Sequence, residues 1–232
     1  MGANAQLSAV RLMLYIFTAN AYPGRAVKDD GELMGRRTLS LNPDRRLQAY
    51  VIGLAIGDGN LSNPNGRATR LRITCDSKYP ALILKIASSL QQLLPSNKVA
   101  LIGSAGNFVN VSVYSNHLEG LLGWKASGGS KHRQGVQVPG WIFEDELLRI
   151  PCLQGLIETD GSVYSDRGYP MVIFSTIIPR LAQQVEAMMR ELGFRPHLYE
   201  TRQCPTTASF KYQVRLSHGV RDFLALVNPL KA

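Results

Sequence analysis

Residues 51–59 read VIGLAIGDG, and residues 153–161 read LQGLIETDG. Each stretch is an apolar run of helical character with a glycine near its middle and an Asp-Gly pair at its end. Glycine in an apolar helix lets a second helix approach closely, because no side chain holds the backbones apart. The two stretches lie a domain length apart, so the chain is predicted to contain one structural unit twice. If the two helices pack side by side, Asp58 and Asp160 become neighbours.

The composition favours a compact protein that binds a polyanion. Hydrophobic residues make up 45% and charged residues 19% of the 232 residues, which is typical of a globular chain and not of a disordered one. Lys and Arg number 26 against 17 Asp and Glu, which gives a net charge of +9. Such an excess attracts nucleic acid over long range, although a generically basic surface is the alternative. A membrane surface is a weaker candidate partner, because no basic amphipathic helix stands out in the sequence.

The cysteines and the apolar runs of the sequence indicate in which cellular compartment the protein is expected. Cys75, Cys152 and Cys204 are widely separated and odd in number, so neither a disulfide framework nor a zinc site is predicted. The most apolar early run, residues 12–19, is too short to span a bilayer. We expect a protein of the bacterial or archaeal cytoplasm, or of an organelle, that is not secreted.

Periodicity predicts the same order of elements around both stretches, namely helix, two strands, helix, two strands, helix. The first unit comprises residues 42–122, with a helix from Pro43 to about Gly57 that Asn42 caps. The second unit comprises residues 141–232, with a helix over residues 142–159. A basic linker rich in Gly and Ser, residues 123–140, connects the two units. The N-terminal extension, residues 1–41, belongs to neither repeat, and three roles stay open for it: packing on the first unit, binding nucleic acid, or origin in an upstream reading frame.

Over about residues 43–228, the two motifs and the element order resemble the LAGLIDADG homing endonucleases, in the single-chain form with two motifs. The resemblance implies an α+β fold of two pseudo-symmetric units. The motif helices would pack at the centre of a monomer, and two saddle-shaped antiparallel sheets would form a groove for double-stranded DNA. It also implies a metal-dependent staggered cut of both strands within a long target, by an enzyme encoded in a mobile intron or a free-standing element.

Phosphodiester hydrolysis explains why paired carboxylates would be needed. The reaction requires an activated water and stabilisation of the leaving oxygen, which divalent cations held by carboxylates can supply. Mg²⁺ prefers oxygen ligands, and Mn²⁺ or Ca²⁺ can bind in its place. Two aspartates held close together repel each other unless a cation compensates them. Asp58 and Asp160 are therefore the predicted catalytic metal ligands, and the resemblance adds the backbone carbonyls of Gly57 and Thr159.

Glu158 lies in the second motif where the first has Ile56. On helical geometry its side chain does not share a face with that of Asp160. We expect a structural or helix-end role for Glu158, with a third metal ligand as the alternative.

The basic residue that assists catalysis is less obvious in this chain. Many members of the family carry a basic or amide residue just after the strand ending near Cys75 and after its equivalent near Ser175. Here Asp76 and Thr176 follow those positions. Candidate replacements are Lys78, Lys125 and Lys131, with ordinary solvated charges as the alternative for the two linker lysines.

Two strands carry side chains suited to DNA contact, because residues spaced by two along a strand share a face. The predicted contact residues are Arg70, Arg72, Lys211, Gln213 and Arg215. An ordinary solvent-facing sheet is the alternative. The facing of strand 108–114 stays open: polarity directs Val111 and Val113 inward, whereas alignment of Ser115 with Ser217 directs them to the face of Gln213 and Arg215.

Two other functions fit the same scaffold. One is an RNA-binding maturase that helps its own intron to fold, and the other is a DNA-binding protein that does not cut. The two retained aspartates favour the endonuclease.

Overall fold

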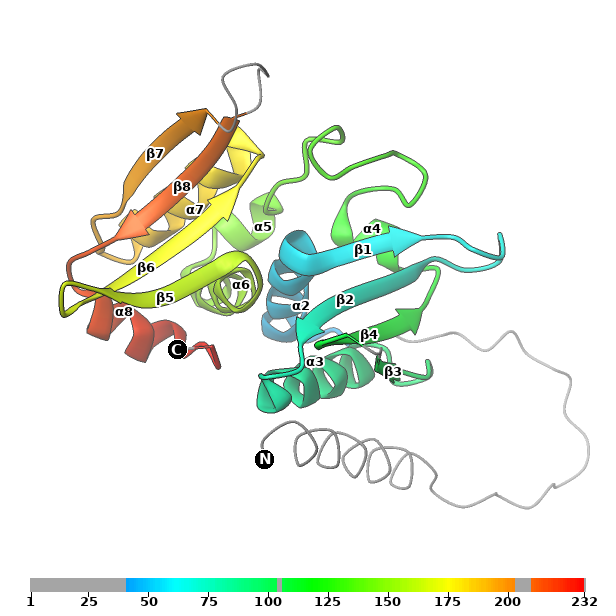
Figure 1. Cartoon of the computed structure of the whole chain (residues 1–232). Helices are drawn as coiled ribbons and strands as arrows, with labels where there is room; N and C mark the ends of the chain where they lie inside the picture. Colours follow the sequence, from blue (N-terminus) through cyan, green and yellow to red (C-terminus); the bar gives the residue numbers. More distant parts are fainter. Residues whose placement is uncertain (1–40, 104–105, 203–209, 232) are drawn as a thin grey trace, which may run out of the picture. The chain divides into compact units, whose positions relative to one another are not determined.

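The computed structural model describes residues 41–103, 106–202 and 210–231. The roles considered for the N-terminal extension concern residues 1–40 and therefore lie outside the described residues, as does Cys204. Within residues 41–231 the chain forms two similar halves with one sheet each (Figure 1).

The elements of the two halves follow the predicted order. The first half consists of α2 (Arg45–Asp58), β1 (Gly59–Ser62), β2 (Arg70–Asp76), α3 (Pro80–Leu93), β3 (Ala100–Gly103), β4 (Phe108–Tyr114) and α4 (Leu118–Leu122). After a connecting loop and the short α5 (Gly140–Phe143), the second half consists of α6 (Glu146–Asp160), β5 (Gly161–Asp166), β6 (Tyr169–Thr176), α7 (Pro179–Glu191), β7 (His197–Arg202), β8 (Phe210–Leu216) and α8 (Val220–Val227). Both sheets are antiparallel, with strand orders β1-β2-β4-β3 and β5-β6-β8-β7. The α+β class and the internal repeat are confirmed.

Two helix boundaries differ from the prediction. Helix α2 begins at Arg45 and not at Pro43, because the Asp44 side chain accepts hydrogen bonds from the backbone N–H groups of Arg46 and Leu47, at 2.9 and 3.2 Å. The single helix predicted over residues 142–159 is in fact α5 followed by α6. The break falls at Asp145, whose side chain accepts from Leu147 N at 2.9 Å and so starts a new helix.

Helices α2 and α6 pack against each other in the middle of the fold, between the two sheets (Figure 1). Glycines make this approach possible. A Cβ atom on Gly155 would lie 2.5 Å from the backbone oxygen of Tyr50 and 2.6 Å from the backbone nitrogen of Leu54, and one on Gly53 would collide with the carbonyl oxygen of Cys152. Both helices are buried over most of their circumference, as a central pair must be.

Each sheet has one apolar inner face and one polar outer face. On β2, Leu71, Ile73 and Cys75 are buried and the residues between them are half exposed. Helix α3 packs on β4, and α7 packs on β6 and β8.

The direction in which the valines of β4 point was left open by the sequence. Val109, Val111 and Val113 are buried, so the interpretation based on polarity is the correct one. The facing inferred by aligning Ser115 with Ser217 was wrong, although α4 and α8 each begin three residues after that serine. The strand registers show that Val111 corresponds to buried Val214 and not to Gln213, because their partners Ile73 and Phe174 both lie opposite the glycine that follows a motif aspartate.

Candidate metal centre and nucleic-acid surface

Asp58 and Asp160 are the last residues of the two central helices, and the ends of these helices abut. The contact is tight enough that a Cβ atom on Gly57 would collide with Thr159 Oγ1. The side chain of Thr159 is itself held in place, because its hydroxyl donates to the backbone oxygens of Gly155 and Leu156, 2.8 and 3.1 Å away. The structure therefore brings the two predicted aspartates together, with the carbonyls of Gly57 and Thr159 beside them.

The helix ends concentrate negative charge at this point. Unpaired carbonyls at a helix C-terminus carry partial negative charge, and the two carboxylates add to it. Neither helix has a basic residue in its last turn, so nothing within the helices compensates this charge. A cation that binds here is stabilised by both helix ends and both side chains.

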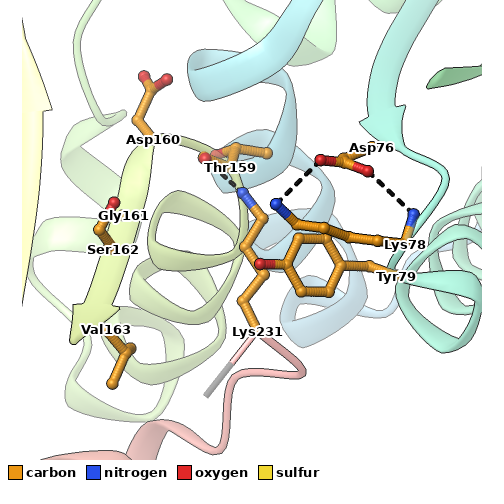
Figure 2. Close-up of a pocket in the computed structure, with 9 residues that line it drawn as sticks. All are labelled: Asp76, Lys78, Tyr79, Thr159, Asp160, Gly161, Ser162, Val163 and Lys231. Carbon is orange, nitrogen blue, oxygen red and sulfur yellow. Dashed lines mark hydrogen bonds and ion pairs between the residues drawn. The ribbon is translucent and has the colours of Figure 1, made fainter. Parts of the chain in front are cut away.

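Two lysines from outside the helices bind these carbonyls. Lys131, from the loop between the halves, donates to the backbone oxygen of Ile56 at 2.6 Å and to that of Gly57. Lys231, which follows α8, donates to the backbone oxygen of Thr159 at 2.7 Å (Figure 2). The carbonyl that precedes each aspartate therefore accepts a hydrogen bond from one lysine. These ammonium groups stand where the expected divalent cations would find oxygen ligands.

Both residues of the acidic pair, Asp58 and Asp160, have raised pKa values. Partial desolvation, together with the charge of Asp58, raises the pKa of Asp160 to about 6, against the lowering effect of Lys131 and Lys231. Desolvation also raises the pKa of Asp58, against the lowering effect of the same two lysines. Burial lowers the pKa of Lys131, and the two carboxylates oppose that shift. The lysines therefore compensate the carboxylates only in part.

The raised pKa of Asp160 predicts how stability depends on pH. A carboxyl with a raised pKa in the folded state contributes fully below its unfolded pKa of 3.8, and that contribution is lost as pH rises through about 6. In chelated buffer, Asp160→Asn should therefore raise the stability by about 1 kcal/mol near pH 7.5, allowing for solvent screening, and change it little near pH 4. Thermal unfolding across this range measures the difference, and an Asn variant that is less stable near pH 7.5 contradicts the electrostatic account.

Two hollows open on either side of Asp160. One, of about 460 Å³, is lined among others by Gly57, Lys131, His132, Asp160, Ser175 and Lys211. The other, of about 310 Å³, includes Asp76, Lys78, Tyr79, Thr159, Asp160 and Lys231 (Figure 2). Asp160 is thus accessible from two pockets that contain lysines, and residues from both halves line each of them. Asp58 lines neither pocket but is itself exposed.

The three lysines that were predicted to assist catalysis lie at different distances from the ends of the motif helices. Lys131 reaches the helix ends, and Lys78 lines the pocket of Figure 2, where it pairs with Asp76 at 3.0 Å. Lys125 does not reach them: its Nζ lies 3.2 Å from Glu119, its side chain is 70% exposed, and it lines neither pocket. The sequence analysis did not single out Lys231. The repeat itself is the signal that could have found it, because Lys231 follows Asp160 at nearly the interval by which Lys131 follows Asp58.

The donors at the helix ends fit a hard divalent cation. They are two carboxylates and two backbone carbonyls, all oxygen, which suits Mg²⁺, Mn²⁺ or Ca²⁺. Among the described residues, no group of three or more His, Cys, Asp or Glu side chains is arranged to hold a metal. A cation held here therefore needs oxygens from a bound phosphate or from water to complete its shell. Glu158 does not contribute, because its carboxylate is buried and hydrogen-bonded elsewhere.

The predicted DNA-contact residues lie on the outer faces of the sheets. On β2, Arg70 and Arg72 alternate with buried Leu71 and Ile73. On β8, Lys211, Gln213 and Arg215 lie on the face opposite buried Val214 and Leu216. Lys211 also lines the larger pocket, so this basic surface extends to the acidic pair.

Arg72 and Arg215 lie in corresponding cross-strand pairs of the two sheets, but on opposite members of the pair, because β2 corresponds to β6 and β8 corresponds to β4. Arg72 is paired with Ser112 across β2 and β4, and Arg215 is paired with Ile173 across the equivalent strands β6 and β8. Both arginines have a buried Nε with no hydrogen-bond partner in the described part of the chain. Arg215 additionally pairs with Asp166 at 3.2 Å. A buried guanidinium donor without an acceptor is costly, so each of the two positions would gain from an acceptor supplied by a ligand.

Comparison with known proteins agrees with this arrangement. Residues 150–228 match the family model of the LAGLIDADG-like domain. Variants of the homing endonuclease I-DmoI superpose with a TM-score of 0.58 and 18% identity, over 79% of this chain and 95% of theirs. The chain has the two-unit LAGLIDADG fold. I-DmoI in complex with DNA and Mn gives a TM-score of 0.56 and 19% identity, over 81% of this chain and 97% of that one. The N-terminal LAGLIDADG domain of DUF199/WhiA gives 0.52 and 12%, over 84% and 87%.

These likenesses establish the LAGLIDADG fold, in which α2 and α6 are the motif helices. No curated protein matches the chain. Within the described residues, no helix is both long and apolar enough to cross a membrane.

Proposed function

We propose that this protein is a site-specific homing endonuclease that requires a divalent cation and cuts both strands of a long DNA duplex. The observation that carries the proposal is the pair of carboxylates at abutting helix ends, with a lysine-containing pocket on each of two sides of Asp160. Two pockets beside one pair of carboxylates suit a reaction on two strands. Because one chain supplies both motif helices, we expect it to act as a monomer.

In this proposal, Asp58 and Asp160, with the carbonyls of Gly57 and Thr159, hold Mg²⁺ or a substitute such as Mn²⁺ or Ca²⁺. A cation bound there would activate a water and stabilise the charge on the leaving oxygen. Lys131 and Lys231 would release the carbonyls and turn to the phosphates, whose negative charge the acidic pair would otherwise repel. Lys78 and Lys211, one in each pocket, are placed to bind the flanking phosphates.

The outer faces of the two sheets would read the target. Arginine can donate two hydrogen bonds to guanine in the major groove, and glutamine can bind adenine in the same way. Arg72 lies on β2 of the first sheet and Arg215 on β8 of the second, so we expect one guanine preference in each half of the target.

Arg72→Ala and Arg215→Ala should each weaken binding to the preferred duplex by about 1–3 kcal/mol and relax the preference at one base pair. Equilibrium binding to the target and to single-base variants of it measures both effects. The matched control is Arg180→Ala, on the exposed side of α7, which should change neither. If the alanine variants weaken binding equally for every sequence, these arginines bind only the backbone.

The function can be tested even while the target sequence is unknown. Duplexes with a random central segment are selected for binding in Ca²⁺, and the enriched sequences are then incubated with Mg²⁺. We expect enrichment of a motif of about 20 base pairs and a staggered cut near its centre. Enriched duplexes that stay intact would favour the DNA-binding protein that does not cut. Failure to enrich any duplex, together with tight binding of the chain's own intron RNA, would favour the maturase.

A further inference from the structure

Glu158 lies in the second motif helix and is held by partners from three other segments. Its carboxylate has 0% exposure and accepts hydrogen bonds from the Tyr50 hydroxyl of α2 at 2.6 Å and from Lys85 Nζ of α3 at 3.1 Å. It also accepts from the backbone N–H of Leu230 at 2.9 Å. A buried carboxylate is costly without such partners. The contacts with Tyr50 and Lys85 join α6 to the first half, and the contact with Leu230 joins it to the segment that follows α8.

The contact with Leu230 belongs to a short strap, defined here as residues 228–231, that binds along α6. Gln154 Nε2 donates to the backbone oxygen of Asn228 at 2.6 Å, and one turn further Glu158 accepts from Leu230. Lys231 then donates to Thr159 O at the helix end (Figure 2). The strap therefore advances along α6 toward Asp160 and ends with an ammonium group in the pocket of Figure 2.

The first half has no equivalent of this device. Ile56 stands where the second motif has Glu158, so α2 has no carboxylate at this position to hold the loop that carries Lys131. That loop is held by the Gln134 amide, which accepts from Lys125 N at 2.8 Å and donates to the backbone oxygens of Lys125 and Gly129, both at 3.0 Å. The two active-site lysines thus depend on separate supports.

We propose that Glu158 is a positioning residue for one of the two strand cuts. Through the Leu230 N–H it fixes the strap, and the strap places Lys231 at the pocket of Figure 2 while leaving Lys131 and the other pocket unaffected. The inference rests on the proposed endonuclease function. It adds that the two cuts are supported independently, so that one can be slowed without the other.

The decisive variant replaces the whole buried network at once, as Tyr50→Phe, Lys85→Met and Glu158→Ile. The last change copies the residue that the first motif carries at this position, and replacement of a complete buried ionic group by apolar side chains is often tolerated. Leu230→Pro is the second variant: it removes only the N–H that Glu158 accepts, at an exposed residue, and leaves the rest of the network intact. Lys231→Met is the reference, because it removes the ammonium group and keeps the strap.

Strand-resolved cleavage of a selected duplex, with each strand labelled separately, measures the effect. All three variants should slow the cut of one and the same strand by about 10-fold to 100-fold and accumulate nicked duplex, with the other cut changed less than about 3-fold. Addition of Lys231→Met to either of the other two should cause no further loss. Lys131→Met should slow the opposite strand. Equal slowing of both strands in a variant that remains folded would overturn the proposal.

A second measurement does not depend on cleavage. Amide hydrogen exchange at Leu230 should be at least about 10-fold faster in the triple variant than in the wild type, and unchanged in Lys231→Met. If Leu230 exchanges equally fast in the wild type and the triple variant, Glu158 does not hold the strap and the proposal is wrong. If the wild type cuts no duplex but Leu230 shows the expected protection, the endonuclease assignment fails while the strap stands.

Discussion

Asp58→Asn and Asp160→Asn should each reduce cleavage of the target duplex by about 1,000-fold or more and leave binding to that duplex intact. Asparagine keeps the size of the side chain and one acceptor oxygen but loses the charge that attracts a divalent cation. Both positions end a motif helix beside the other, so neither carboxylate can be replaced by a neighbour. Loss of a negative charge beside phosphate should, if anything, tighten DNA binding.

Cleavage with Mg²⁺ and binding with Ca²⁺, measured on the same selected duplex, separate these two effects. The matched control is Asp76→Asn, because Asp76 lines the same pocket as Asp160 but is paired with Lys78. This change should alter the rate by less than about 10-fold. If Asp58→Asn and Asp160→Asn both cut at the wild-type rate, the acidic pair is not the reaction centre.

Gly155→Ala is expected to have the largest effect on stability. The added methyl group would lie 2.5 Å from Tyr50 O and 2.6 Å from Leu54 N, and backbone atoms cannot rotate away as a side chain can. The two central helices must therefore move apart, at an expected cost of about 3 kcal/mol or more and a fall in Tm of about 10 °C. The same movement separates Asp58 from Asp160, so cleavage should fall more steeply than the folded fraction does.

Thermal unfolding and cleavage below the unfolding transition test this prediction together. Gly120→Ala is the control, because Gly120 lies in α4 and a Cβ atom there meets nothing within 4 Å. It should leave the stability unchanged or raise it slightly, since alanine favours helix. A Gly155→Ala protein as stable as the Gly120→Ala control would show that the helices do not pack as closely as described.

Features set by local pattern could be predicted from the sequence. The duplicated apolar stretches predicted the central helix pair, and strict alternation predicted which side chains of β2 and β8 face outward. For β4 the polarity of the strand was the correct guide, and the alignment of Ser115 with Ser217 misled because the strands are offset by one residue from it, so that Val111 corresponds to Val214. Burial of valines outweighs a single capping interaction in free energy, so it is the stronger signal.

The rest of the site depends on contacts between distant residues. The Glu158 carboxylate meets Tyr50 across 108 positions of sequence and Leu230 across 72, and no periodicity encodes such pairings. Lys125, Lys131 and Lys231 are indistinguishable as types, and only the fold shows that the first pairs with Glu119 while the other two bind the helix ends. That Arg72 and Arg215 lie in corresponding cross-strand pairs likewise requires the register of both sheets.

The central claim is that the two carboxylates at the seam of the motif helices hold cations against the DNA backbone. A crystal structure of the protein with its selected duplex and Mn²⁺, with data collected for anomalous scattering, tests it most directly. We predict manganese peaks within bonding distance of the Asp58 and Asp160 carboxylates, with phosphate oxygens of both strands beside them and Lys131 and Lys231 turned away from the carbonyls of Gly57 and Thr159. Well-ordered DNA in the groove, with manganese bound elsewhere and both lysines still on those carbonyls, would contradict the claim.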